Sequence, residues 1–362
     1  MSAEASLKAW LALSLTRGLG GENARRLLRE FGSPDAVFAA SFSSLKSVVK
    51  TDVAAEISKG AIDDAVAPAL VWLEDNNNHI VTLADSDYPQ ALLNIPDPPL
   101  LLYVKGRLDL LNRSALAVVG SRNATPQGIS NAEAFAKSLS DAGLCIISGM
   151  AHGIDAAAHR GALRSQGKDS GGSIGIVGTG LDIVYPAANR ELAHALAEQG
   201  ALISEFPLGT PPLAANFPRR NRLISGMSLG CLVVEASLQS GSLITARLAL
   251  EQGRDVFAIP GSIHAPQSKG CHALLKQGAK LVETAQDILE ELGGSIETPA
   301  AAPGSKGASP MLLEHLGFDP VDVDTLSSRC GLTIAELSAM LLALELSGHI
   351  CVLPGGLYQR IH

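Results

Sequence analysis

Short apolar runs alternate with longer segments of helical periodicity through the middle of this chain. The runs are ALAVVG (115–120), LCIISG (144–149), IGIVGTG (174–180), LISEF (202–206), CLVVEA (231–236), DVFAIPG (255–261) and AKLVE (279–283). A strand with one face in water would alternate polar and apolar positions, so nearly continuous apolar runs predict a parallel sheet that helices cover on both faces. We therefore expect an α/β fold with an extended Rossmann-like, doubly wound and mainly parallel sheet.

The segments that precede this core predict two further parts. Residues 79–106 combine strand-like runs with several prolines, and we expect them to pack on the edge of the main sheet. In residues 1–75, Leu27, Leu28 and Phe31 have helical spacing between a glycine-rich turn and Ser33-Pro34. This pattern predicts a helical module of the helix-hairpin-helix or SAM-like kind. Such a module can hold a DNA phosphate or serve only for docking, and the sequence leaves both open.

The C-terminal part is set apart by a linker-like composition at 293–310, rich in Gly, Ser, Pro and Ala. Residues 311–362 then show three helical segments and two short strands around Pro354-Gly355-Gly356, which predicts a winged helix. This module carries six acidic residues and two arginines, so we expect a structural or protein-binding role rather than the reading of duplex DNA. The predicted units are 1–75, 76–292, the linker 293–310, and 311–362.

Composition narrows the class of protein. The chain has 362 residues, 46% of them hydrophobic, and its five cysteines never occur as CxxC. Neither a disulfide framework nor a zinc module is indicated, which is typical of a reducing cytoplasm. The N-terminus lacks the pattern of a signal peptide and no apolar run is long enough for a membrane span. We expect a cytoplasmic protein with no membrane contact.

Charge is distributed unevenly along the chain. The formal net charge is -8, yet residues 217–280 contain eight lysines and arginines against three acids, and residues 112–168 contain six against three. The middle of the chain is therefore locally basic, which indicates an anionic ligand there.

Glycines and hydroxyl residues follow several predicted strands. In an open α/β sheet, ligands bind where the carboxyl ends of the strands meet helix N-termini, because free N–H groups point to that edge. The helix expected to begin at Thr125-Pro126 would add such N–H groups beside the first turn. The candidates for a phosphate-binding rim are Gly120, Ser121 and Arg122, then Gly149, then Gly178, Thr179 and Gly180, and finally Ser240, Gly241 and Ser242.

The segment FPRRNR (217–222) places three arginines within six residues. It follows a proline-rich loop and is expected to precede a helix. Arg220 and Arg222, with Asn221 between them, would grip a phosphodiester through fork geometry, and Phe217 would offer a flat face to a base. Two alternatives stay open: Phe217 belongs to the core, or the arginines pair with Glu205 or Glu235.

Catalytic and metal chemistry find little support in the sequence. His152, Asp155 and His159 have spacings of three and four, as metal ligands on one helix face would. No fourth ligand lies nearby, however, and Asp155 is more simply explained as a residue that caps the helix or orients loops. No serine has the GxSxG setting. We expect no metal and no catalytic set.

Residues 80–290 resemble the DNA-processing protein A (DprA/Smf) family. The stretches that carry the resemblance are VVGSRNATPQG, IISGMAHGIDAAAH, GTGLDIVYPAANREL, LISEFP, FPRRNRLISG, VVEASLQSGSLITARLA and GRDVFAIPGS. The resemblance implies a non-enzymatic protein without cofactor that binds single-stranded DNA, protects it, displaces single-strand-binding protein and loads the RecA recombinase in natural transformation or recombination. It also implies a homodimer formed through the Rossmann domain. By the same resemblance, the DNA pocket would use Gly120, Ser121 and Arg122 together with Phe217, Arg220, Asn221 and Arg222, whereas Arg219 falls on an unspecified position.

An enzymatic function is the main alternative. The lysine-decarboxylase-like phosphoribohydrolases have a similar Rossmann core and cleave the N-glycosidic bond of a nucleotide. Glu235 would be the acid in such an enzyme, but the PGGxGTxxE string of that family is absent.

Overall fold

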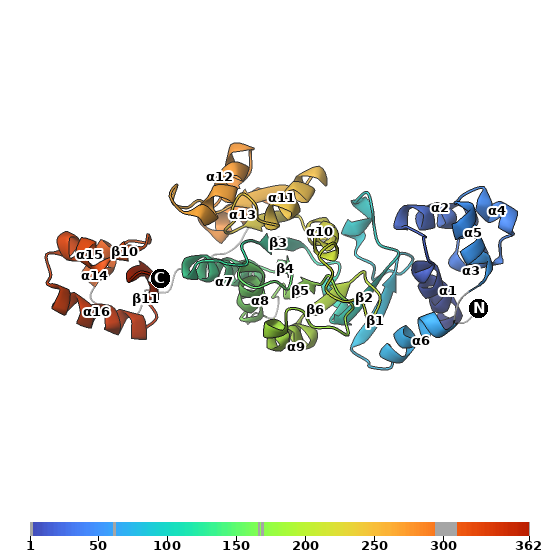
Figure 1. The fold of residues 1–362 in the computed structure, drawn as a ribbon, viewed down its shortest axis with the longest axis horizontal. Coiled ribbons are helices and arrows are strands. Elements are labelled where there is room, and N and C mark those ends of the chain that lie inside the picture. Colours follow the sequence, from blue (N-terminus) through green and yellow to red (C-terminus); the bar gives the residue numbers. More distant parts are fainter. Residues whose placement is uncertain (1–2, 61–62, 166, 168–169, 294–309, 362) are drawn as a thin grey trace.

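The computed structural model describes residues 3–60, 63–165, 167, 170–293 and 310–361. Figure 1 shows a helical module at the N-terminal end, a central α/β unit, and a small module formed by the C-terminal residues. Within the described residues no helix is both long enough and apolar enough to cross a bilayer.

The centre of the molecule is a nine-stranded sheet in the order β1-β2-β6-β5-β4-β3-β7-β8-β9. Its parallel strands are β3 (Ala115–Val119), β4 (Cys145–Ser148), β5 (Ser173–Ile176), β6 (Ala201–Ser204), β7 (Gly230–Val233), β8 (Asp255–Ala258) and β9 (Lys280–Leu281). Each lies within or beside a predicted apolar run, so the α/β prediction is confirmed. Strands β3 to β6 follow one another to one side of β3, and β7 to β9 continue on the other. The topological switch point therefore lies between β3 and β7.

The edge next to β6 carries the predicted extension. Strands β1 (Asn78–Thr82) and β2 (Leu101–Gly106) pair antiparallel with each other, and β2 pairs antiparallel with β6. The proline-containing segment between them holds only a 3₁₀ turn, Gln90–Asn94. The prediction that residues 79–106 pack on the edge of the main sheet is confirmed.

Helices cover both faces of the sheet, which explains why the strands are apolar throughout. They are α7 (Pro126–Asp141), α8 (Ile154–Leu163), α9 (Arg190–Gln199), α10 (Asn216–Gly226), α11 (Ser242–Glu251), α12 (Lys269–Lys276) and α13 (Ala285–Glu291). Leu116 and Val118 belong to the buried cluster formed with α7, α8 and α13. The alternate residues Ala117 and Val119 belong to the cluster formed with α10, α11 and α12. Figure 1 shows α7 and α8 on one side of the sheet and α11 and α12 on the other.

One boundary differs from the prediction. Residues 217–222 do not precede a helix but form the first turns of α10. Pro218 is compatible with this position because the N–H groups of a first helical turn have no partner within the helix. The helix therefore begins earlier than expected, at Asn216, and helical geometry decides where the arginines of this segment point.

The N-terminal module consists of α1 (Ala3–Leu15), α2 (Gly21–Phe31), α3 (Pro34–Ala39), α4 (Phe42–Lys46), α5 (Thr51–Ser58) and α6 (Asp63–Trp72). It has a core of its own around Leu13, Leu27 and Ile57. A second cluster joins Trp10 and Leu11 to Tyr103 of β2. The module therefore packs directly on the antiparallel edge of the sheet.

The C-terminal module has the predicted winged-helix composition. Its elements are α14 (Pro310–Leu316), β10 (Val321–Asp322), α15 (Val323–Cys330), α16 (Ile334–Leu346), β11 (Ile350–Leu353) and β12 (Leu357–Arg360). The strands form a sheet in the order β10-β12-β11, one strand more than predicted. Leu326, Leu337 and Ile350 belong to a core that lies within the module.

Candidate nucleic-acid interface

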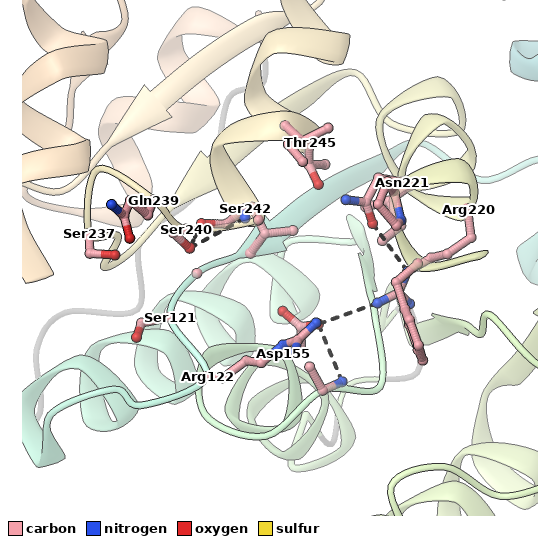
Figure 2. Close-up of a pocket in the computed structure, with 18 of the residues that line it drawn as sticks. Ser121, Arg122, Asp155, Arg220, Asn221, Ser237, Gln239, Ser240, Ser242 and Thr245 are labelled. Carbon is pink, nitrogen blue, oxygen red and sulfur yellow. Dashed lines mark hydrogen bonds and ion pairs between the residues drawn. The ribbon is translucent and has the colours of Figure 1, made fainter. Parts of the chain in front are cut away.

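A cavity of about 580 Å³ opens at the switch point of the sheet. Its wall includes the turn after β3, the first turns of α10 and the loop from β7 into α11, and other segments add Ala151, Asp155, Tyr185, Pro212 and Ala214. Figure 2 shows Ser121 and Arg122 on one side, Arg220 and Asn221 on a second, and the hydroxyl side chains around Ser240 on a third. The structure thus brings together residues from distant parts of the sequence, as the rule of strand ends predicts.

The turn after β3 has a fixed backbone. The Ser121 N–H donates to the Glu235 carbonyl at 2.7 Å, and the Ser121 carbonyl accepts from the Ile154 N–H at 3.2 Å. A Cβ on Gly120 would lie 2.6 Å from Cγ1 of Ile154, so a larger residue would push this turn outward. Arg122 is exposed, and no salt bridge engages it within the described part of the chain. Its guanidinium is therefore available to an anion.

The N-terminus of α7 was expected to offer free N–H groups to a ligand, but it is closed. The Gly128 N–H donates to Oγ1 of Thr125 at 3.0 Å. The Thr125 N–H and hydroxyl donate to Glu235 at 2.9 and 2.5 Å. Burial raises the pKa of Glu235, while these hydrogen bonds act in the opposite direction. Because this chain's own carboxylate occupies the helix terminus, the expectation of a phosphate there is wrong.

Arg220 lies at the base of the cavity and is nearly buried, with 7% of its side chain exposed. Its Nη1 donates to the carbonyl of Ile176, and its Nε donates to Oδ1 of Asn221 at 3.2 Å. Nη2 lies 3.9 Å from Oδ2 of Asp155, an ion pair drawn in Figure 2. Desolvation lowers the pKa of Arg220, and the Asp155 carboxylate opposes this shift. The guanidinium therefore brings a fixed positive charge to the cavity floor.

Gly149 makes room for that guanidinium. A Cβ built on Gly149 would lie 2.2 Å from Nη2 of Arg220 and 2.5 Å from Oδ2 of Asp155. Gly149 itself does not line the cavity. The structure therefore gives this predicted site residue a role in packing under Arg220. Gly180 also lies away from the cavity wall, where a Cβ would meet Asp182.

Arg222 points away from the cavity. Its Nη2 lies 2.5 Å from Oε2 of Glu205, and its Nε lies 3.5 Å from Oδ2 of Asp97. Arg219 also pairs with Oε2 of Glu205, at 3.1 Å. Positions i and i+2 of a helix do not face each other, so Arg220 and Arg222 lie on different sides of α10. The expectation that these two arginines form one fork is wrong, and pairing with Glu205 is observed instead.

Aromatic rings line a smaller cavity of about 90 Å³ beside the first. Phe217 is half-buried and lies 5.6 Å from the ring of Tyr185, centroid to centroid, with the planes tilted by 42°. A Cβ on Gly178 would lie 3.1 Å from Cδ1 of Phe217, so the ring packs closely over this glycine. Gly178 and the buried Thr179 line the small cavity, as does Phe217. Phe217 is therefore a wall residue.

Tyr185 was missed by the sequence reasoning, and so were polar residues of the β7–α11 loop. Tyr185 is 46% exposed although it is aromatic, and it follows a glycine-rich strand end, which is the signal that could have identified it. The predicted Ser240, Gly241 and Ser242 do line the large cavity, with the two serine hydroxyls 2.7 Å apart. The additional polar wall residues are Asn123, Ser237, Gln239 and Thr245.

The residues that suggested a metal site do not converge. His159 is buried, with Nε2 2.8 Å from the Gly149 carbonyl and Nδ1 2.8 Å from the Ser173 hydroxyl. Burial lowers its pKa to about 4, so the imidazole is neutral. Asp155 accepts a long hydrogen bond of 3.4 Å from the Ala151 N–H and so orients the loop before α8. No group of three metal-ligating side chains occurs among the residues that the structure describes.

The sequence profile described as DNA recombination-mediator protein A matches residues 79–293, and the DprA winged helix domain matches residues 296–356. Protein Smf of Escherichia coli is 45% identical over 308 residues, which cover 82% of this chain and 81% of that protein. The DNA processing protein DprA of Streptococcus pneumoniae is 48% identical over 210 residues, 58% of this chain and 73% of that protein.

Solved structures agree with these matches. The X-ray structure of DNA processing protein A from Streptococcus pneumoniae aligns with a TM-score of 0.68 at 38% identity, covering 78% of this chain and 97% of that one. DNA processing protein A from Helicobacter pylori, solved to describe its single-stranded DNA binding mode, aligns with a TM-score of 0.53 at 30% identity over 59% of this chain and 95% of that one. The chain therefore belongs to the DprA/Smf family of DNA processing proteins.

Proposed function

We propose that this chain binds single-stranded DNA in the switch-point cavity and acts in DNA processing without being an enzyme. The observation that carries the proposal is the cavity itself. It combines an exposed Arg122 that no salt bridge engages among the described residues, the fixed charge of Arg220 and the rings of Phe217 and Tyr185. Cations that hold phosphates, beside aromatic faces on which bases stack, favour single strands with little sequence preference. The single-stranded DNA binding mode described for the Helicobacter pylori relative supports the same ligand.

The contacts proposed for DNA follow from the wall of the cavity. Ser121 and Arg122 would hold one phosphate, while Asn221, Ser240, Gly241 and Ser242 would meet the strand on the opposite side. Phe217 would stack on a base, with Gly178 and Thr179 behind it. Arg220 would act through its charge from the floor. Arg222 would not contact DNA, because Glu205 and Asp97 hold its side chain.

Non-enzymatic function is favoured by the surroundings of Glu235. A phosphoribohydrolase would need this carboxyl to face the nucleotide, but its oxygens accept hydrogen bonds from Thr125 at the start of α7. Glu235 does not belong to the cavity wall. The test is release of free base from nucleoside monophosphates, and steady turnover would contradict this part of the proposal.

The finer biological role rests on membership of the family. We propose that the protein works in the cytoplasm, protects incoming single strands, displaces single-strand-binding protein and loads RecA as a homodimer in transformation or recombination. The assay is RecA-driven strand exchange on DNA already covered by single-strand-binding protein. Addition of this protein should shorten the lag before exchange, and an unchanged lag would contradict the loading role.

The binding proposal itself is tested with a dT oligomer and a matched duplex in the presence of EDTA. We expect salt-sensitive binding of the oligomer, weaker binding of the duplex, and no need for a metal ion. Equal affinity for both forms would contradict a cavity that accepts unstacked bases.

A further inference from the structure

Helix α10 is held on the face opposite the cavity by a chain of charged side chains that begins in the N-terminal module. We propose that Arg25 of α2 is a positioning residue, which acts through Asp97 and Arg222 to set the place of α10 and hence of Arg220 and Phe217. The expected effect on DNA binding rests on the proposed function. The coupling of the N-terminal module to α10 is independent of the proposed function.

The first link is a clamp on the segment between β1 and β2. Nη1 of Arg25 lies 2.8 Å from Oδ1 of Asp97 and donates to the carbonyl of Pro98 at 2.8 Å, while Nη2 donates to the carbonyl of Pro96 at 3.3 Å. Only 10% of the Arg25 side chain is exposed. A planar guanidinium with three acceptors in one turn fixes the orientation of that turn.

The second link passes from that turn to α10. Oδ2 of Asp97 lies 3.5 Å from Nε of Arg222, so the two oxygens of one carboxylate contact arginines of two different modules. The packing of the same segment is close as well, because a Cβ on Gly226 of α10 would lie 2.8 Å from Cγ2 of Ile95. Figure 1 shows the segment between β1 and β2 lying between α10 and the N-terminal helices.

The third link anchors α10 to the sheet. Glu205 follows β6, its side chain is 3% exposed, and Arg222 is its partner at 2.5 Å. Burial raises the pKa of Glu205 and the arginines lower it, so the carboxylate depends on them to stay charged. Separating Arg222 from Glu205 would leave an uncompensated buried charge, which is costly. This cost holds the Arg222 side chain, and with it α10, beside Glu205.

The opposite side of the same helix carries cavity residues. Arg220 lies two positions before Arg222, and Phe217 lies one turn before Asn221. A short helix moves as a rigid body, so a shift of its outer face changes the position of both side chains in the cavity. The N-terminal module therefore influences DNA affinity without touching DNA.

The test compares Arg25→Ala with Arg26→Ala in the full chain. Arg26 is the matched control because it is an exposed arginine on the same helix and belongs to no salt bridge within the described residues. Hydrogen exchange without DNA should be faster in α10 for Arg25→Ala and unchanged for Arg26→Ala. Affinity for a dT oligomer should fall by about threefold to tenfold for Arg25→Ala and stay unchanged for Arg26→Ala. The dependence of that affinity on salt should keep its slope, because no phosphate contact is lost.

Asp97→Asn provides a second variant, since it removes the charge that joins Arg25 to Arg222 and keeps the size of the side chain. Faster exchange in α10 for this variant supports the proposal even where Arg25→Ala lowers overall stability. Unchanged exchange in α10 for Asp97→Asn overturns it. A shallower salt slope for Arg25→Ala also overturns it, because Arg25 would then contact DNA directly. If the unaltered protein fails to bind the oligomer, the proposed function fails, and exchange in α10 still decides this inference.

Discussion

At the residue scale, the environment of Arg220 explains why a glycine precedes the loop after β4. Gly149→Ala would place a methyl group within 2.2 Å of Nη2 of Arg220 and force the guanidinium off the cavity floor. We expect Gly149→Ala to lower affinity for a dT oligomer by about tenfold and stability by about 1–3 kcal/mol. Fluorescence anisotropy and urea unfolding measure the two effects.

The control for that variant is Gly20→Ala, where no atom lies within 4 Å of the added Cβ and φ is -78°. It should leave affinity unchanged and lower stability by less than about 1 kcal/mol, because Gly20 is the N-cap of α2, where alanine is less favourable than glycine. Full DNA affinity in Gly149→Ala would show that the position of Arg220 does not matter for binding.

The buried His159 predicts a pH dependence of stability. Because burial lowers its pKa from 6.5 to about 4, the folded protein binds fewer protons than the unfolded chain between those values. This contribution to stability is complete above pH 6.5 and is lost as the pH falls toward 4, by about 3 kcal/mol in total. The measurement is the free energy of unfolding in urea from pH 4 to pH 8.

His159→Gln should flatten this pH dependence. The difference in the free energy of unfolding between the variant and the unaltered protein should therefore shrink at low pH. His152→Gln removes an exposed imidazole from the same segment and serves as the control. Parallel pH curves for His159→Gln and the unaltered protein would contradict a neutral, buried imidazole.

At the scale of single elements, α10 carries one buried and one exposed arginine that pair with the same carboxylate. Arg222 is 13% exposed beside the 3% exposed Glu205, whereas Arg219 is 58% exposed on the same carboxylate. We expect Arg222→Ala to cost about 3 kcal/mol of stability, because it leaves the buried Glu205 without its main partner. Arg219→Ala should cost less than about 1 kcal/mol, since exposed ion pairs contribute little.

Urea unfolding of the two variants at pH 7 measures this difference directly. The two arginines share one acceptor and one helix, so each is the other's control. Equal losses of stability would contradict the assignment of Arg222 as the structural partner of Glu205.

The strands could be predicted from the sequence, but the direction of the α10 side chains could not. Continuous apolar runs such as ALAVVG have one simple explanation, a strand buried on both faces, and β3 is where that pattern placed it. The cluster FPRRNR fits both a loop and the first turn of a helix, because proline is tolerated in either. Only the helical geometry shows that Arg220 faces the cavity and Arg222 faces Glu205.

Other parts of the site depend on contacts that no local pattern specifies. Tyr185 lines the cavity from the segment after β5, and its ring packs on Phe217 of α10. Glu235 closes the N-terminus of α7 by bonding Thr125, which lies 110 positions earlier. Strand order and such long-range pairs depend on the three-dimensional arrangement of the chain. The sequence therefore predicted which edge of the sheet carries the site, but not the individual contacts within the site.

At the scale of the whole molecule, charge and architecture fit together. The chain has a formal net charge of -8, yet the cavity combines Arg122 and Arg220 with the single carboxylate of Asp155. The C-terminal module exposes acidic side chains, Asp319, Asp324, Glu336 and Glu345. Acids repel phosphates, so a protein partner or a structural role for that module stays our prediction. The division of the chain at residues 75, 292 and 310 likewise stays a prediction.

The central claim is that a phosphate of single-stranded DNA binds Arg122 at the switch point. The measurement that tests it most directly is titration of a dT oligomer at about 50 and 200 mM salt with the unaltered protein, Arg122→Ala and the exposed control Arg26→Ala. We predict that Arg122→Ala lowers affinity by about tenfold at low salt and reduces the slope of log K against log salt by about 0.7. Arg26→Ala should change neither quantity. An unchanged affinity and slope for Arg122→Ala would contradict the account.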